Sequence, residues 1–188
     1  YLREIAAAPA TVKFGGPAVL SRFNPKIVAC LELVAELLDR GEQVVIVSSR
    51  IEQTNAVHDL LGEAIGREKI SRIDSEVGAK HAAHQSQLFK SGKTRVHLMG
   101  IKCAAGHSYS HCPNEIILSI EFSYGPFHQA KGRIDRVNSA QPAKIYVILH
   151  KDSIEESMYD RCATKQDAAT ICLHGKRIPR DFQPIDVG

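Results

Sequence analysis

The sequence predicts an α/β fold in which a parallel sheet is covered by helices on both faces. Short runs of β-branched and apolar residues, such as residues 44–47, alternate with longer segments whose apolar residues recur at helical spacing. Strands that alternate with helices at this rhythm pair in parallel, because each helix returns the chain to the same end of the sheet. The 188 residues, of which 44% are hydrophobic, suffice for a domain with a buried core.

The first helix is predicted to begin at Asn24-Pro25, after an irregular lead-in over residues 1–25. Asn24 is a favourable cap and Pro25 suits the first helical turn. Apolar residues follow at helical spacing until Gly41, a typical helix terminator. The strand at residues 44–47 comes next, and its continuous apolar run is typical of a buried parallel strand.

The alternation then continues to the end of the chain. We expect, in order, a helix over residues 51–65, a strand over 69–74, a helix over 78–90, strands over 95–99 and 115–120, a helix that starts near Pro126, a strand over 144–149, and a helix from about 153 to 173 before a basic tail.

Composition excludes some classes of protein. No segment approaches the roughly 18 consecutive apolar residues of a membrane span, and the first residues do not form a signal peptide. The chain begins without methionine, which indicates a piece of a longer protein. Its five cysteines are odd in number and scattered, so we expect an intracellular protein, cytoplasmic if it is bacterial or encoded by a phage. No zinc pattern fits Cys103, His107, His111 and Cys112, and we expect no metal site in this chain.

Three polar segments are predicted at the carboxyl ends of parallel strands, where ligands bind in such sheets. They are Ser48-Ser49-Arg50, residues 100–110 and residues 119–125. The two serines also fit a simpler role as caps of the following helix. A formal net charge of only +3 means that any nucleic-acid surface must be local.

A basic segment follows the third of these loops. On a helix, Gln129, Arg133 and Arg136 fall at i, i+4 and i+7 and share one face. Two guanidinium groups beside an amide can bind phosphate oxygens. The same residues also fit a solvated basic turn of a helix.

The pattern Q-x-x-G-R-x-x-R at Gln129–Arg136 resembles the last conserved motif of superfamily-two helicases. Val45-Ile46-Val47-Ser48 resembles their fourth motif, residues 98–110 occupy the place of the fifth, and Ser153-Ile154-Glu155-Glu156 resembles the opening of the helix after the last strand. In order and spacing these segments are similar to the C-terminal lobe of Swi/Snf-type DNA-dependent ATPases over nearly the whole chain.

The resemblance implies a RecA-like fold of the P-loop NTPase type and three regions: a connector between lobes over residues 1–25, the lobe itself over 26–150, and a C-terminal helix and basic tail over 151–188. It implies that Arg133 and Arg136 are catalytic arginine fingers. The implied nucleotide-binding residues are Gln129, Gly132 and Gly106, and the implied contacts to the nucleic-acid backbone are Ser48, Ser49, Arg50, Gly106 and Ser108.

The resemblance also implies the ligands and partners. ATP and Mg²⁺ would be bound mainly by an N-terminal lobe of the same protein, and none by this chain alone, because the sequence has no phosphate loop and no D-E-x-D or D-E-x-H segment. Gly92-Lys93-Thr94 mimics the end of a phosphate loop, but residue 87 is glutamine rather than glycine. Duplex DNA is the expected substrate, and we expect the chain alone to be monomeric and inactive.

The fifth motif departs from the family pattern. It reads Cys103-Ala104-Ala105-Gly106-His107-Ser108 and retains only Gly106, with Ser108 where asparagine is usual. Such departures indicate a divergent member of phage or bacterial type. Two alternatives stay open from the sequence: an RNA helicase lobe, and a free-standing α/β nucleic-acid-binding domain without ATPase activity.

Overall fold

The computed structural model describes residues 24–75, 77–104, 106–120, 124–131, 134, 142–174 and 185–187. Its strands form one sheet in the order β2-β3-β1-β4-β5-β6, and every pairing is parallel. The strands are β1 (Val44–Ser48), β2 (Ile70–Ile73), β3 (Val96–Gly100), β4 (Asn114–Ile117), β5 (Lys144–His150) and β6 (Ile185–Val187). The predicted parallel α/β fold is therefore confirmed.

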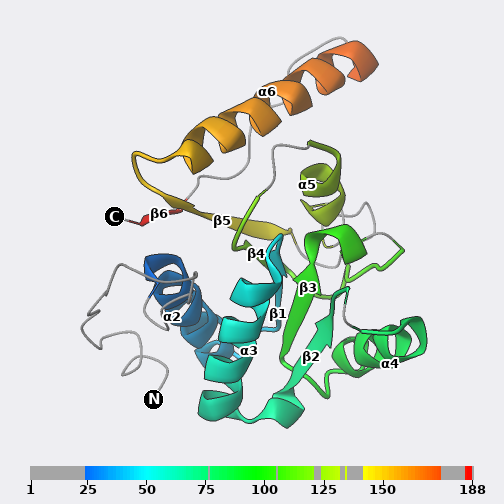
Figure 1. Cartoon of the computed structure of the whole chain (residues 1–188). Coiled ribbons are helices and arrows are strands. Elements are labelled where there is room, and N and C mark those ends of the chain that lie inside the picture. The colour runs from blue at the N-terminus through cyan, green and yellow to red at the C-terminus, as the bar shows by residue number, and fades with distance from the viewer. Residues whose placement is uncertain are drawn as a thin grey trace.

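In the described ranges, five α-helices connect and cover these strands (Figure 1). They are α2 (Pro25–Asp39), α3 (Ile51–Ile65), α4 (Ala79–Lys90), α5 (Tyr124–Lys131) and α6 (Ile154–His174), with short 3-10 helices η1 (Arg67–Lys69) and η2 (Ile101–Ala104). The helix α2 begins as predicted, because the Asn24 side chain accepts a hydrogen bond of 2.9 Å from the Lys26 amide and Pro25 occupies the first turn. It ends at Asp39, and Gly41 follows two residues later with a φ of 74°, in the left-handed region that glycine adopts readily.

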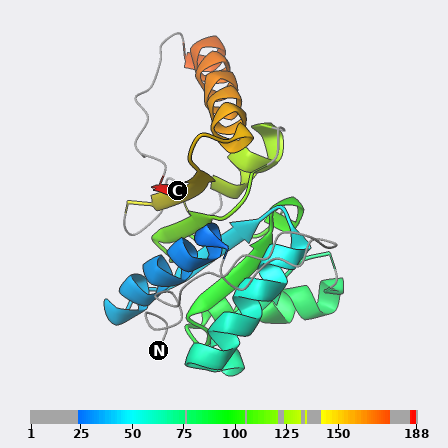
Figure 2. The ribbon, with the colours of Figure 1, turned by 60° about the vertical axis from the view of Figure 1, so that its left-hand side comes forward.

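Side chains of β1 alternate between two hydrophobic layers, as the pleat of a strand requires. Val44 and Ile46 pack with α2 and α3 on one face of the sheet, and Figure 2 shows these two helices side by side over it. Val45 and Val47 pack on the opposite face with residues of α4 and α5. On this second face, α6 covers β4 and β5 through Tyr159 and Cys162. Helices thus cover both faces of the sheet, as predicted.

The structure differs from the sequence prediction at two strands. β4 ends at Ile117, three residues before the predicted end, since the hydroxyl of Ser119 bonds the Ser49 amide where a strand would use its backbone. β6 lies within the segment predicted as a basic tail and pairs with β5, and its three residues are too short a run to give a periodic signal. In the part of the chain that the structure describes, every helix is too short or too polar to cross a membrane.

Candidate nucleotide and nucleic-acid edge

The carboxyl ends of β1 and β4 are joined by a network of serine hydroxyls. Ser48 is 4% exposed, and its hydroxyl lies 3.0 Å from the Arg50 carbonyl oxygen, 3.1 Å from Gln53 Oε1 and 3.0 Å from Ser119 Oγ. Ser119 Oγ also accepts hydrogen bonds from the Ser49 amide at 2.8 Å and the Ser49 hydroxyl at 2.9 Å. These bonds fix the loop after β1 against the end of β4.

The loop after β1 leads directly into α3. Arg50 is the N-cap residue, yet its side chain makes no capping hydrogen bond and is exposed. The first-turn amides of an α-helix have no partner within the helix, and they favour a bound anion. Of the three predicted contact residues here, Arg50 and the half-buried Ser49 are accessible to a ligand, whereas Ser48 is buried beneath them.

The loop after β3 contains the two other predicted backbone contacts. Gly106 is exposed and has a φ of 86°, where an L-residue would be strained. A Cβ added there would meet no atom within 4 Å, so the surface beside this glycine is open. Ser108 is half-buried two residues later. The loop therefore leaves its backbone accessible next to a hydroxyl group.

The carboxyl ends of β2 and β3 approach each other closely. Asp74 is buried and forms an ion pair with Arg72, which lies two residues earlier on β2. A Cβ added at Gly100 would lie 3.5 Å from the Cα and the Cβ of Asp74. Asp74 thus contacts the start of the loop that leads to Gly106, and its carboxylate is engaged with Arg72 at this edge.

The helix α5 lies beside the loop after β3, and the predicted arginine fingers follow it. Gln129 is exposed, whereas Ala130 is buried in the same cluster as Ile101 of η2. Ile134 is 1% exposed and belongs to that cluster too. Ala130 and Ile134 therefore pack in the same cluster as the start of the loop of the fifth motif. Gly132, Arg133 and Arg136 themselves lie outside the described residues, so their shared helical face stays a prediction.

A buried ion pair that the sequence analysis missed lies at the same edge. Lys26 is 0% exposed, and its Nζ lies 2.8 Å and 2.9 Å from the two carboxylate oxygens of Glu155. Glu155 Oε2 also accepts a hydrogen bond of 2.9 Å from the His150 amide. The pair joins the start of α2 to the start of α6. One signal was present in the sequence: a lysine in the first turn of a helix opposes the helix dipole and needs a specific partner.

The pKa values of this pair are set by burial and by the mutual contact. Burial lowers the pKa of Lys26, and the hydrogen bond that its ammonium donates to Glu155 opposes that effect only in part. Burial by itself would raise the pKa of Glu155, but its bonds with Lys26 and with the His150 amide together keep the pKa below the usual value. The carboxylate is therefore ionised at neutral pH and available to the ammonium group.

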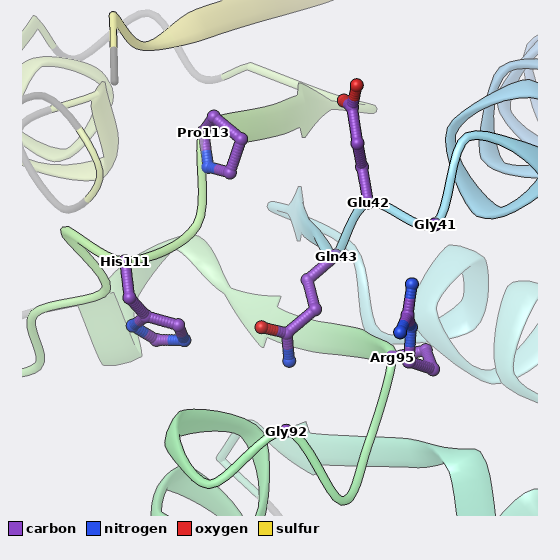
Figure 3. A pocket seen from close by; sticks show the side chains of 7 residues that line it. All are labelled: Gly41, Glu42, Gln43, Gly92, Arg95, His111 and Pro113. Carbon is purple, nitrogen blue, oxygen red and sulfur yellow. The ribbon is translucent and has the colours of Figure 1, made fainter. Parts of the chain in front are cut away.

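The described residues also form a shallow polar pocket at the opposite, amino edge of the sheet (Figure 3). Its volume is about 310 Å³. The figure shows the side chains of Gln43 and His111 directed into it from two elements. No predicted site residue lines this pocket, and Gly41 and Gly92, which follow the ends of α2 and α4, line it together with Arg95.

The cysteines and histidines of the loop after β3 have structural contacts. The Cys112 thiol is buried and donates to the carbonyl oxygen of Gln43 at 3.3 Å or that of Asn114 at 3.4 Å. His107 and His111 pack around the ring of Tyr109. Among the residues that the structure describes, no three His, Cys, Asp or Glu side chains come together as metal ligands.

Comparison with known proteins bears on the identity of this fold. A search of curated proteins finds no match. Among solved structures, the C-terminal part of the Fun30 ATPase domain is similar, with a TM-score of 0.66 and 24% sequence identity over 73% of this chain and 45% of that chain. This likeness shows the fold, and the chain spans less than half of the length of that solved chain. The model of the helicase conserved C-terminal domain matches residues 26–138. Because that match covers more than half of the 188 residues, the chain belongs to the helicase conserved C-terminal domain family.

Proposed function

We propose that this chain is the second motor lobe of an ATP-dependent DNA translocase of the Swi/Snf type. The observation that carries the proposal is the convergence of predicted ligand-binding residues at one edge of the sheet, in a chain that belongs to a helicase family. Arg50 and Gly106 are exposed there, at the carboxyl ends of neighbouring strands β1 and β3. A domain with only a structural role would not require this arrangement.

The nucleic-acid side of the lobe consists of the loops after β1 and β3. Arg50, Ser49 and the first-turn amides of α3 bind one backbone phosphate, and the amides around Gly106 with the Ser108 hydroxyl bind another. Ser48 acts indirectly, since its buried hydroxyl bonds the neighbouring Arg50 amide at 3.1 Å and orients the loop. Contacts to phosphates and not to bases make movement along DNA independent of sequence.

The nucleotide side consists of α5 and the segment after it. ATP and Mg²⁺ are bound mainly by a first lobe of the same protein, and this lobe approaches the γ-phosphate. Arg133 and Arg136 stabilise the charge that develops during phosphoryl transfer, Gln129 orients them or the nucleotide, and Gly132 permits close approach. The family match extends to residue 138 and so includes all four positions. Closure of the lobes on ATP and opening after hydrolysis move the protein along its strand.

The test is the ATPase activity of the complete two-lobed protein, with and without duplex DNA. Arg133→Ala and Arg136→Ala are each expected to lower DNA-stimulated kcat roughly 10³-fold, the scale of an arginine finger. Arg67→Ala is the matched control. Arg67 is an exposed arginine on η1 whose guanidinium pairs with Asp59 at 3.1 Å, and its removal is expected to leave the rate unchanged.

The outcomes separate the alternatives. Stimulation by duplex DNA that both finger variants abolish supports the proposal. Stimulation by RNA alone would identify an RNA helicase lobe instead. An ATPase that is indifferent to both arginines would show that the finger assignment is wrong.

A further inference from the structure

One buried aromatic side chain anchors the loop that contains Gly106 and Ser108. Tyr109 is 0% exposed, although it lies between residues of a surface loop. Loop residues are usually accessible to solvent, so burial of a ring this large indicates a fixed attachment point. The Tyr109 carbonyl oxygen also accepts a hydrogen bond of 2.8 Å from the Cys112 amide, which closes the turn behind it.

The ring of Tyr109 rests on two aromatic residues from different elements. Its centroid lies 4.7 Å from that of His97 on β3 and 5.5 Å from that of Phe89 at the end of α4. The Phe89 contact is edge to face, with an interplanar angle of 79°. The Lys90 ammonium lies 5.8 Å from the centroid of the same ring. Such contacts orient the Tyr109 ring as well as burying it, because they favour particular angles between rings.

His97 is itself fixed by a chain of hydrogen bonds from the neighbouring strand. Its Nδ1 lies 2.7 Å from the hydroxyl of Ser71 on β2, and that hydroxyl accepts a bond of 3.0 Å from Thr94 Oγ1. His97 stacks on Phe89 at 5.0 Å with an interplanar angle of 23°. The imidazole that supports Tyr109 is therefore oriented by side chains from β2, from the segment before β3 and from α4.

The residues just before Tyr109 lie close to its buried ring. His107 and Tyr109 have parallel rings, at an interplanar angle of 1° and a centroid distance of 6.2 Å. Ser108 lies between these two residues and is only half-buried, so part of it is accessible from solvent. Gly106 is three residues before the anchor and exposed.

We propose that Tyr109 is a positioning residue for nucleic-acid binding, whose ring, supported by His97 and Phe89, fixes the loop so that Gly106 and Ser108 meet a backbone phosphate. This inference rests on the proposed function of the lobe. Tyr109 makes no contact with DNA in this account. Its buried ring restricts the loop before DNA binds, so the loop loses less conformational entropy on binding. The same cluster contains Ile134, so the anchor lies in the layer that also supports the segment around Arg133.

The test measures the duplex DNA concentration that gives half-maximal ATPase activity (KM for DNA) and the kcat at saturating DNA, in the complete protein. Tyr109→Leu keeps an apolar side chain but removes the ring. We expect it to raise the KM for DNA about tenfold or more while kcat changes less than about twofold, because a displaced loop weakens binding and not the chemical step. Tyr109→Phe keeps the aromatic ring, and we expect its KM for DNA to equal that of the native protein.

Two further variants separate positioning from loss of stability. Val57→Ala removes buried methyl groups on the opposite face of the sheet and is expected to lower the unfolding temperature without changing the KM for DNA. Ser71→Ala removes the hydroxyl that orients His97 and is expected to raise the KM for DNA about threefold, by the same loosening of the loop. If Tyr109→Leu does not fold, the KM for DNA of Ser71→Ala tests the positioning role of Tyr109.

The two proposals fail in different ways. If DNA stimulates the native protein and Ser108→Ala raises the KM for DNA, but Tyr109→Leu and Ser71→Ala do not, the positioning role is wrong and the proposed function stands. If DNA does not stimulate the native protein, the proposed function is wrong and the positioning role falls with it.

Discussion

At the scale of single residues, His97 shows how burial sets the protonation state of a side chain. Burial lowers its pKa from an ordinary 6.5 to about 3, and electrostatic interactions with His107, His111 and Lys90 act in the same direction. The folded state therefore contains a neutral imidazole at physiological pH. A neutral ring suits this place, since it packs against two aromatic rings and hydrogen-bonds the Ser71 hydroxyl.

The depressed pKa of His97 makes stability depend on pH. Between about pH 6.5 and pH 3 the unfolded chain binds a proton at this histidine and the folded chain does not, so stability falls as pH falls through that range. We expect the thermal unfolding midpoint to decrease from pH 7.5 to pH 5, and His97→Phe to reduce that decrease. His84→Gln, a change at an exposed histidine, is the control and should keep the native pH dependence. Equal pH dependence in His97→Phe and the native chain would contradict the assignment.

Also at the residue scale, the accessible and the buried members of a motif were distinguished only by the structure. Ser48, Ser49 and Arg50 were predicted together as backbone contacts. In the structure Arg50 is exposed, Ser49 is half-buried, and Ser48 is buried with 4% of its surface exposed. The reason is the Ser119 hydroxyl, which lies 71 residues from Ser48 in sequence and draws both serines toward β4.

At the scale of secondary-structure elements, the Lys26–Glu155 pair joins α2 to α6. The helix α6, at the top of Figure 1, extends away from α2, α3 and α4, and this ion pair fixes its first turn at the edge of the sheet. Glu155 has 21% of its side chain exposed and Lys26 has none, so the ammonium depends on this carboxylate for compensation. A buried charge without a partner is costly.

Removal of one member of this ion pair is therefore expected to lower the free energy of unfolding more than removal of both. Glu155→Gln should lower the free energy of unfolding by about 3 kcal/mol, because it leaves the Lys26 ammonium buried without its carboxylate. The double variant Lys26→Met with Glu155→Gln should recover much of that loss, since methionine has an uncharged stem of similar length. Urea unfolding measures both values. Glu156→Gln, at the adjacent position, is the control. If the two substitutions change the free energy of unfolding additively, the two side chains do not stabilise each other.

At the scale of the whole molecule, the proposed function assigns this chain one half of a catalytic arrangement. Phosphoryl transfer requires a phosphate cradle, acids that bind Mg²⁺ and an arginine finger. The sequence contains candidates for the finger and no phosphate loop or D-E-x-D segment. The carboxyl edge is correspondingly basic and hydroxyl-rich at Arg50, Ser49 and Ser108, which suits phosphate contact from the opposite side of a cleft.

The purified 188-residue chain is therefore expected to hydrolyse no ATP above background, with or without duplex DNA. The complete protein should hydrolyse ATP, because in the proposed function a first lobe supplies the phosphate and metal ligands that this chain lacks. A phosphate-release assay on both proteins at equal concentration provides the comparison. Clear turnover by the chain alone that Arg133→Ala abolishes would overturn the division of roles between the lobes.

The sequence by itself determined the order and type of nearly every element and the helicase family. Helical and strand periodicities are local patterns, and Asn24, Pro25 and Gly41 mark helix ends through their own backbone preferences. The spacing of Gln129, Arg133 and Arg136 is likewise readable without a structure. The short strand β6 escaped prediction because three residues contain too little periodicity.

Only the tertiary structure decided which polar residues are accessible to a ligand and which are bonded to other side chains. Lys26 meets Glu155 across 129 residues of sequence, and Tyr109 meets His97 from a different element. Such pairs depend on how the layers pack, and no local pattern records them. Burial follows from the same packing, because it is the sum of contacts from all neighbouring elements. The candidate edge was therefore predictable as a place in the fold, while its internal arrangement was not.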